Sequence, residues 1–343
     1  MVLSFNGSEN TLRCLESLYQ ITYPDYYVIV VDNCSQDDSV PRIKEWAEGR
    51  IHLESKFLQY NPEGKPIRYI VYKRPEAEAG GDKEKEIVNL PSQKRLIIIE
   101  NERNYGNAGG KNIGMRYALN TLNIEYVVLL DNDTIVSPHF LDELVIVASR
   151  EPGAGILGSK IYHSDTSEVW SEGGLINYWK GTTLQRGPKL SALAEGKDAV
   201  EMDWVATCCA MVSRQMCQTI GLLDEDFTFG FEEVEIGIRA NRHGFKVLYV
   251  PKSEIRHDPS HTSVDMQRRR MLYYSVTKGQ FTLMHKYWSR LQFITATLYF
   301  FAHHLSYLFH FLVYSRDWDA VKLRLRGLLD FIKERKGYRR IKT

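Results

Sequence analysis

The sequence has little cysteine, and its cysteines lack the spacing of a disulfide scaffold or a zinc site. Five cysteines occur in 343 residues, and none forms a Cys-x-x-Cys pair. An odd number with this spacing argues against a disulfide framework and favours a reducing compartment. The first residues also lack a basic stretch ahead of an apolar run, so we predict no signal peptide. Together these absences predict a cytoplasmic protein.

An excess of charge of one sign is also missing from the chain as a whole. The net charge is +1, which gives no argument for nucleic acid, and we expect no nucleic-acid partner. The charges are unevenly distributed, because residues 316–343 hold ten Lys or Arg against four Asp or Glu. A tail of this composition suits an anionic surface such as a membrane.

The longest uncharged run is not apolar throughout. Residues 291–314 contain no Lys, Arg, Asp or Glu over 24 positions, but three His, a Gln and several Ser or Thr interrupt them. We predict an interfacial helix here, followed by a basic amphipathic stretch at 321–335. The alternatives are an ordinary buried helix or one that mediates a homo-oligomer and, third, a membrane insertion at 291–314.

What the sequence does contain is an alternation of strands and helices. Residues 27–31 are β-branched or aromatic and continuously apolar, as in strands that are covered on both faces. Strand 2–5, helix 8–19, strand 27–31 and helix 39–46 follow one another. This order predicts an α/β fold with a doubly wound, mostly parallel sheet.

A break in this rhythm at 51–95 is interpreted as an insertion, with a hairpin-like piece at 67–72. The alternation resumes with strand 96–100, a helix over 111–122 and strand 126–130, and residues 153–202 read as a strand-like surface for a second binding site. We predict one domain over 1–263 and a helical, membrane-associated region over 264–343.

The strand at 126–130 is followed by two carboxylates, Asp131 and Asp133. Ligands of open α/β sheets bind beyond the carboxyl ends of the strands. Two carboxylates one residue apart at that edge can hold a divalent cation, which in turn holds phosphate oxygens. A plain strand-end turn is the competing interpretation. Asp32 ends an earlier strand and can accept a hydrogen bond from a nucleobase imide or a ribose hydroxyl.

The segment 104–114 is rich in glycine and leads into a helix. Glycines allow close approach of the backbone to phosphate or sugar, and a helix N-terminus favours anions. The pattern lacks the Walker and dinucleotide-binding spacings, which lowers the NTPase and dehydrogenase interpretations. Asn104, Gly106 and Lys111 are therefore candidate contacts of a phosphate or sugar group.

Carboxylates are also dense before the helix predicted at 232–243. Acidic residues there complement the helix dipole, but a carboxylate in an apolar setting is also what a general base requires. Glu232 and Glu233 are therefore candidate catalytic residues. His257 follows the last predicted strand and becomes a metal ligand only if it lies beside Asp133.

The order of these motifs resembles the family 2 glycosyltransferases, and most closely their rhamnosyltransferase-like and galactofuranosyltransferase-like members. The resemblance covers about residues 2–263. It rests on Phe5-Asn6, Asp32-Asn33-x-Ser35-x-Asp37, Asn104-x-Gly106-x-x-Gly109-Gly110-x-Asn112-x-Gly114, Leu130-Asp131-Asn132-Asp133, Gly221-x-x-Asp224-Glu225-x-Phe227, Glu232-Glu233, Arg239, Gly244, Pro251 and His257.

The resemblance implies the GT-A fold and an inverting transfer from a nucleotide-diphosphate sugar. By similarity Asp32 contacts the base, with Asn6 also at the nucleotide-sugar, and Asp131 contacts the ribose or sugar. Asp133 and His257, with Asp131 beside them, hold Mn²⁺ or Mg²⁺ on the diphosphate. UDP- and dTDP-sugars are both compatible with Asp32.

The acidic pair departs from the family pattern. The family usually has Glu-Asp where this chain has Glu232-Glu233, so the base position carries one methylene more. Either Glu233 or Glu232 is the base, and Glu232 is also a candidate acceptor contact. By the same resemblance, Trp204 and Arg239 line the acceptor or support the acidic pair.

Two alternatives remain beside the glycosyltransferase. A nucleotidyltransferase would want a basic Gly-rich signature after the first strand, where this chain has Asn6-Gly7-Ser8-Glu9. A non-catalytic sugar-binding or scaffold relative is kept open by the Glu at 233. The membrane-leaning tail predicts a glycan or lipid-linked glycan acceptor, with the protein peripheral on the inner face of the cell membrane.

Overall fold

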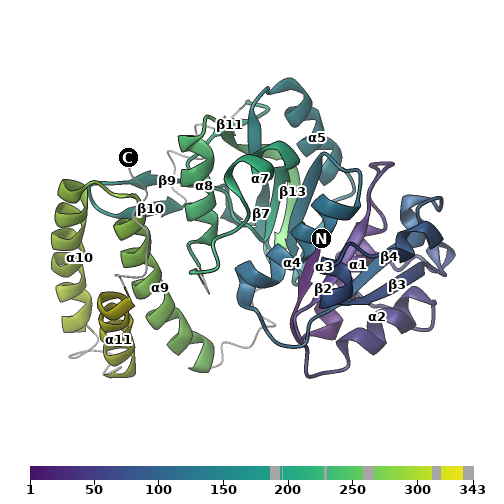
Figure 1. Cartoon of the computed structure of the whole chain (residues 1–343), viewed down its shortest axis with the longest axis horizontal. Coiled ribbons are helices and arrows are strands. Elements are labelled where there is room, and N and C mark those ends of the chain that lie inside the picture. Colours follow the sequence, from purple (N-terminus) through teal and green to yellow (C-terminus); the bar gives the residue numbers. More distant parts are fainter. Residues whose placement is uncertain (186–193, 195, 228–229, 258–265, 311–317, 335–343) are drawn as a thin grey trace.

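A mixed β-sheet runs through the molecule with helices on both faces (Figure 1). The computed structural model describes residues 1–185, 194, 196–227, 230–257, 266–310 and 318–334. The strands are β1 (Val2–Ser4), β2 (Val28–Asp32), β3 (Arg68–Lys73), β4 (Arg95–Glu100), β5 (Tyr126–Asp131), β6 (Thr134–Val136), β7 (Ala154–His163), β8 (Val169–Ser171), β9 (Gly174–Asn177), β10 (Thr182–Gln185), β11 (Val200–Glu201), β12 (Cys209–Ser213) and β13 (Lys246–His257). The helices are α1 (Ser8–Leu18), α2 (Ser39–Ala47), α3 (Arg74–Glu78), α4 (Gly106–Thr121), α5 (Phe140–Arg150), α7 (Arg214–Ile220), α8 (Glu232–Arg242), α9 (Met266–Tyr287), α10 (Arg290–His310) and α11 (Trp318–Glu334).

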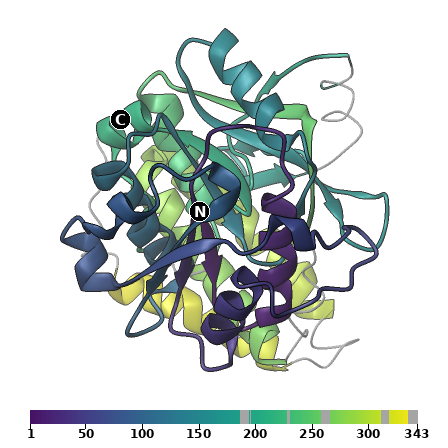
Figure 2. The ribbon, with the colours of Figure 1, turned by 90° about the vertical axis from the view of Figure 1, so that its right-hand side faces the viewer.

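The first half of the chain forms the parallel part of this sheet. Strands β3, β4, β2, β1 and β5 lie side by side and all run parallel. Alternate residues of β2 face opposite cores, with Val28 and Val30 on the side of α1 and α2, and Ile29 and Val31 on the side of α4. This double burial explains the continuously apolar strand and confirms the predicted doubly wound sheet. Figure 2 views the molecule from this end.

The second half makes the sheet mixed. Strand β12 is antiparallel to both β5 and β7, while β7 and β13 are parallel to each other. Neither β12 nor the short β6 was predicted from the sequence. Cys208 and Cys209 are small core residues, because both are buried. All five cysteines lie among the described residues, and none is disulfide-bonded.

The hairpin-like interpretation of 67–72 was wrong. This stretch is the single strand β3, which pairs parallel with β4 at the edge of the sheet. Its inward-facing Ile70 and Tyr72 are buried, so the apolar alternation reflects a strand with one covered face rather than a turn between two strands. At least this part of the predicted insertion continues the central sheet.

Helix α4 begins at Gly106, five residues earlier than the sequence predicted at 111. Its glycines let it lie close against the sheet. A Cβ at Gly110 would come within 2.6 Å of Leu3, and one at Gly114 within 2.8 Å of Val31. The glycines of this segment therefore serve helix–sheet packing as well as the loop.

The C-terminal helices α9, α10 and α11 occupy the end of the molecule away from β3 (Figure 1). The predicted helical character is confirmed. Phe281 of α9, Phe300 of α10 and Phe331 of α11 share one hydrophobic core with Trp204 and with residues of α8. The predicted boundary at 263 falls outside the described residues, as do residues 311–314 of the uncharged run. Among the described residues, no helix is both long and apolar enough to cross a bilayer.

Candidate functional site

Asp32 and Asp131 lie at the same edge of the sheet. In the parallel register, Ser4 of β1 is level with Asp32 of β2, and Leu3 of β1 is level with Asp131 of β5. Both carboxylates thus leave the carboxyl ends of strands that flank β1. The sequence placed these residues at strand ends, and the parallel pairing brings those ends together.

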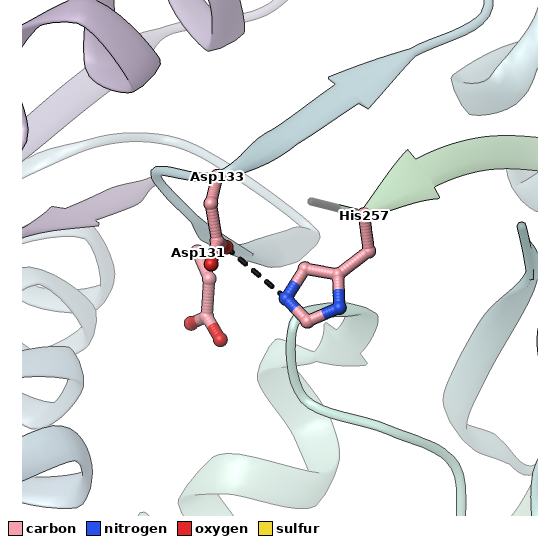
Figure 3. Close-up of side chains that lie close together, drawn as sticks. All are labelled: Asp131, Asp133 and His257. Atoms are coloured by element: carbon pink, nitrogen blue, oxygen red, sulfur yellow. Dashed lines mark ion pairs between the residues drawn. The ribbon is translucent and has the colours of Figure 1, made fainter. Parts of the chain in front are cut away.

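His257 reaches this edge from the other half of the chain. The short strand β6 follows Asp133 and pairs antiparallel with the end of β13, so that Thr134 is level with His257. The imidazole Nε2 consequently lies 3.1 Å from Oδ1 of Asp133 (Figure 3). His257 therefore lies beside Asp133, as its role as a metal ligand requires.

Asp131, Asp133 and His257 fit a divalent cation. One ligand atom from each lies within 4.8 Å of the other two. Asp133 and His257 are nearly buried, while the Asp131 side chain is 31% exposed. Two carboxylates and an imidazole suit Mn²⁺ and, through the oxygens, Mg²⁺. A cavity of about 290 Å³ adjoins Asp133; it is lined by the cations Arg13, Lys56 and Arg256, and also by acidic residues.

Lys111 connects the two carboxylate groups of the site. It is fully buried, and its Nζ lies 2.8 Å from Oδ1 of Asp131 and donates to the backbone oxygen of Thr207. Burial disfavours the charged form, but the carboxylates of Asp131 and Glu232 outweigh it and raise the pKa of Lys111. The residue therefore stays an ammonium ion between Asp131 and α8.

The acidic pair begins α8. Phe231 precedes it with a positive φ of 71°, and the glutamates occupy the first turn, where the helix dipole favours them. Oε1 of Glu232 accepts a hydrogen bond of 2.5 Å from Asn107 of α4, whereas its buried Oε2 has no hydrogen-bond partner among the described residues. Glu232 is buried and Glu233 is half-buried.

The pKa of Glu233 is raised well above that of an ordinary glutamate. Burial is the main cause, and the negative charge of neighbouring Glu232 adds to it. A carboxyl group with this shift holds a proton more firmly than an exposed one, which is the property expected of a general base that works near neutral pH.

The two carboxylate oxygens of Asp32 differ in their hydrogen bonds. Oδ2 accepts from the backbone N–H of Ser35 at 3.1 Å, and Oδ1 is buried without a hydrogen-bond partner in the described part of the chain. Burial raises the pKa of Asp32. A buried acceptor without a donor is costly unless a ligand supplies one.

The amide side chains of Asn6 and Asn104 are engaged within the protein. Asn6 accepts from the backbone N–H of Gln36, and Asn104 accepts from Gly106 and from Asn33. Their contact with a nucleotide-sugar stays a prediction. Sequence reasoning missed the role of Asn33, which is buried and also bonds Tyr105 and Asn101. Its place in the Asp32-Asn33-x-Ser35 motif was the signal for it.

Arg239 and Trp204 lie behind the acidic pair. Arg239 donates to both carboxylate oxygens of Glu235 and to the backbone oxygens of Ile220 and Leu222. Trp204 is buried against α8, where a Cβ at Gly237 would clash with the backbone at 203–204. Both residues thus brace α8, and their contact with an acceptor stays a prediction.

Two families of known proteins match this chain, and together they cover most of its length. The family described as "Glycosyltransferase like family 2" matches residues 69–273, and "Glycosyl transferase family 2" matches residues 1–74. The chain belongs to glycosyltransferase family 2.

Curated relatives of this family-2 chain include rhamnosyltransferases. It is 27% identical over 150 residues to N-acetylglucosaminyl-diphospho-decaprenol L-rhamnosyltransferase of Mycobacterium tuberculosis, covering 40% of this chain and 48% of the relative. It is 23% identical over 212 residues to dTDP-rhamnosyl transferase RfbF of Shigella flexneri, covering 60% and 69%. With the hexosyltransferase Agl10 of Haloferax volcanii it shares 28% over 162 residues, 46% of this chain and 50% of the relative. The matched region thus spans about half the length of several of these relatives.

Solved structures show the same fold. GalNAc-T7 with UDP, GalNAc and Mn²⁺ aligns with a TM-score of 0.55 and 15% identity, over 85% of this chain and 48% of that one. The mannosyltransferase PcManGT of Pyrobaculum calidifontis with GDP-Man and Mn²⁺ aligns with a TM-score of 0.52 and 14% identity, over 97% and 85%. The predicted GT-A-type α/β fold is confirmed.

Proposed function

We propose that this chain is a metal-dependent inverting glycosyltransferase. It moves a sugar from a UDP- or dTDP-sugar to a hydroxyl group of a glycan or lipid-linked glycan. The observation that carries the proposal is the Asp131–Asp133–His257 cluster. Buried Lys111 is paired with Asp131 of this cluster, and the charge of Glu232 also raises the pKa of Lys111. Membership of family 2 favours this function over the nucleotidyltransferase alternative.

The donor is bound along the carboxyl edge of β1, β2 and β5. Oδ1 of Asp32 accepts the imide N–H that uracil and thymine share, which supplies the donor that this buried oxygen lacks within the described residues. Asn6, Asn104 and Gly106 hold the loops around the nucleotide. The dTDP-rhamnosyl transferase of Shigella flexneri is a relative whose name specifies a donor that fits this pattern.

The diphosphate is held where the two halves of the sheet meet. Asp133 and His257, with Asp131 beside them, would hold Mn²⁺ or Mg²⁺, which when bound supplies Lewis-acid stabilisation of the leaving diphosphate. Asp131 also accepts from the ribose or donor sugar. Lys111 fixes the orientation of Asp131 and keeps a positive charge beside it.

Glu233 is the base that removes the proton from the acceptor hydroxyl as the new glycosidic bond forms. Its raised pKa supports this assignment, as does its partial exposure, which leaves a path for an acceptor. Glu232 is less suited, because Asn107 occupies one of its oxygens. Its other oxygen orients the acceptor or the donor sugar. A single in-line displacement of this kind inverts the anomeric centre.

The acceptor is a lipid-linked glycan, and the protein works as a peripheral protein at the inner face of the cell membrane. The name of the Mycobacterium tuberculosis relative specifies a diphospho-decaprenol acceptor. Five free cysteines, four of them buried, are compatible with a reducing compartment.

Donor-binding measurements test the metal site directly. The full chain is screened by thermal shift with UDP- and dTDP-sugars, with and without Mn²⁺. We expect a stabilisation that depends on Mn²⁺ and is lost in Asp133→Ala. Asp198→Ala is the matched control, since Asp198 only forms exposed surface pairs. An undiminished shift in Asp133→Ala would remove this residue from the site.

A further inference from the structure

Helix α11 packs against α9 with its inner face and exposes its outer face to solvent. On the inner face Phe331 is buried, and a Cβ at Gly327 would meet the backbone oxygen of Tyr274 on α9 at 2.6 Å. On the outer face Trp318, Leu325 and Leu329 are 58%, 50% and 54% exposed. The spacing of seven and four residues places them on one side of the helix. The exposed apolar stripe is therefore a stable feature of the fold.

Helix α10 repeats this arrangement. Its inner residue Phe300 packs edge-on against Phe281 of α9, the same residue that Phe331 of α11 contacts. Its exposed large apolar residues are Leu291, Ile294, Leu298 and Phe301. Both helices therefore bury one side on α9 and expose apolar side chains on the other, at the end of the molecule farthest from β3 (Figure 1).

Basic side chains border the stripe of α11. Lys322, Arg326 and Lys333 are exposed on the same helix. The sequence that follows, 335–343, adds five Lys or Arg and no acidic residue. An apolar stripe edged by cations is the pattern of a helix that lies in the interface of an anionic bilayer.

Charge also distinguishes a bilayer from a second copy of this chain. A two-fold dimer through this surface would place the basic edges of both copies in one interface, although Asp330 pairs with Arg326 and Lys333 within each copy. The headgroups of an anionic membrane neutralise the same side chains. The bilayer is the better complement.

We propose that the outward faces of α10 and α11 dock this protein on an anionic lipid bilayer, with Trp318, Leu325 and Leu329 at the boundary of headgroups and acyl chains. The proposal rests on the peripheral membrane location given above and identifies the surface responsible. Lys286 of α9 donates to Asp224 and Asp226, just ahead of the acidic pair. The docked helices are thus tied to the half of the site that receives the acceptor.

Vesicle co-sedimentation of the full chain tests this surface. We expect binding to phosphatidylcholine vesicles that contain about a third phosphatidylglycerol, and weak binding to phosphatidylcholine alone. The apolar variant Leu325→Ser/Leu329→Ser and the charge variant Lys322→Glu/Arg326→Glu should each lose at least about tenfold in partitioning. Only the charge variant should lose its preference for anionic lipid.

Controls separate this test from that of the enzyme. Ile146→Ser changes an exposed apolar residue on α5 and should bind vesicles as the wild type does. Asp133→Ala should also bind normally, so a failed catalytic proposal leaves this result unaffected. Equal sedimentation of the wild type and both double variants would overturn the docking surface. The docking surface would also be overturned if the wild type were a dimer that does not bind vesicles and the Leu325→Ser/Leu329→Ser variant were a monomer.

Discussion

The two halves of this molecule contribute to the site in different ways. The parallel half, β1 to β5, presents Asp32 and Asp131 at strand ends that lie on either side of β1 in the sheet. The mixed half presents His257 and the acidic pair through contacts between segments distant in sequence, such as β6 with β13 and Asn107 with Glu232. In the proposed mechanism the first half binds the nucleotide-sugar, whereas the second brings the metal ligand His257 and the general base to it.

This difference indicates which site residues depend most on long-range contacts. A strand-end carboxylate keeps its place as long as the parallel sheet forms. His257 and Glu233 keep theirs only if contacts between distant segments hold. On the side of Glu233, Arg239 ties α8 to the backbone at Ile220 and Leu222, and Lys286 ties α9 to Asp224. The proposed metal centre joins the halves, since Asp133 comes from one and His257 from the other.

The largest effect is expected where the halves meet. Asp133→Asn and His257→Gln should each lower kcat/KM on the order of 10³-fold, because several kcal/mol of charge stabilisation at the leaving diphosphate is lost. Steady-state kinetics at saturating Mn²⁺ measure this. The double variant should be little worse than either single one, since both remove one centre. Fully additive losses would mean that the two residues act at separate places.

The next largest effect concerns the base. Glu233→Gln should lower kcat by about 10²-fold or more, since an amide cannot accept the proton. Glu233→Asp, which restores the residue usual in the family, should retain most of the activity, and Glu232→Gln should change KM for the acceptor more than kcat. A larger kcat loss in Glu232→Gln than in Glu233→Gln would exchange the two roles.

The brace between α9 and the acceptor half should matter for stability rather than chemistry. Lys286→Met removes hydrogen bonds from a buried ammonium to Asp224 and Asp226. We expect a loss of about 2 kcal/mol in the free energy of unfolding, measured by urea denaturation. Lys246→Met removes a surface pair with Glu151 and should lower the free energy of unfolding far less, because water screens exposed pairs. Equal losses in the two variants would show that α9 is not held in this way.

The pH profile sharpens the assignment of Glu233. Since burial and Glu232 raise its pKa, the deprotonated form that acts as base is depleted on the acid side of neutrality. We expect kcat/KM to rise with pH by about tenfold per unit until the raised pKa is passed. In Glu232→Gln the adjacent negative charge is absent, which should move the profile to lower pH by on the order of one unit. An unmoved profile would assign the titration to another group.

The smallest effect is expected in the parallel half. Asp32→Asn keeps the size of the side chain but weakens its hydrogen bond to the nucleobase. We expect KM for the donor to rise about tenfold with kcat nearly unchanged, corresponding to about 1.4 kcal/mol of uniform binding. Competition by UDP and dTDP gives the same quantity independently. A kcat defect without a change in donor binding would place Asp32 outside the nucleotide site.

The amino-acid sequence by itself determined the parallel sheet, its strand ends and the acidic residues that follow them. The continuously apolar sequence of β2 and the glycines at the start of α4 are local signals. The first indicates a strand buried on both faces, and the second indicates a backbone that can approach its neighbours closely. The same signals misread β3 as a hairpin, since an apolar alternation does not say which strand it pairs with.

Only the tertiary structure decided that His257 meets Asp133, that Lys111 is buried against Asp131, and that Asn107 holds Glu232. These contacts join segments separated by 20 to 125 positions. Their existence depends on strand pairing and on the exclusion of water around the charges, which set both the distances and the raised pKa of Glu233. Neither is a property of any short stretch of sequence.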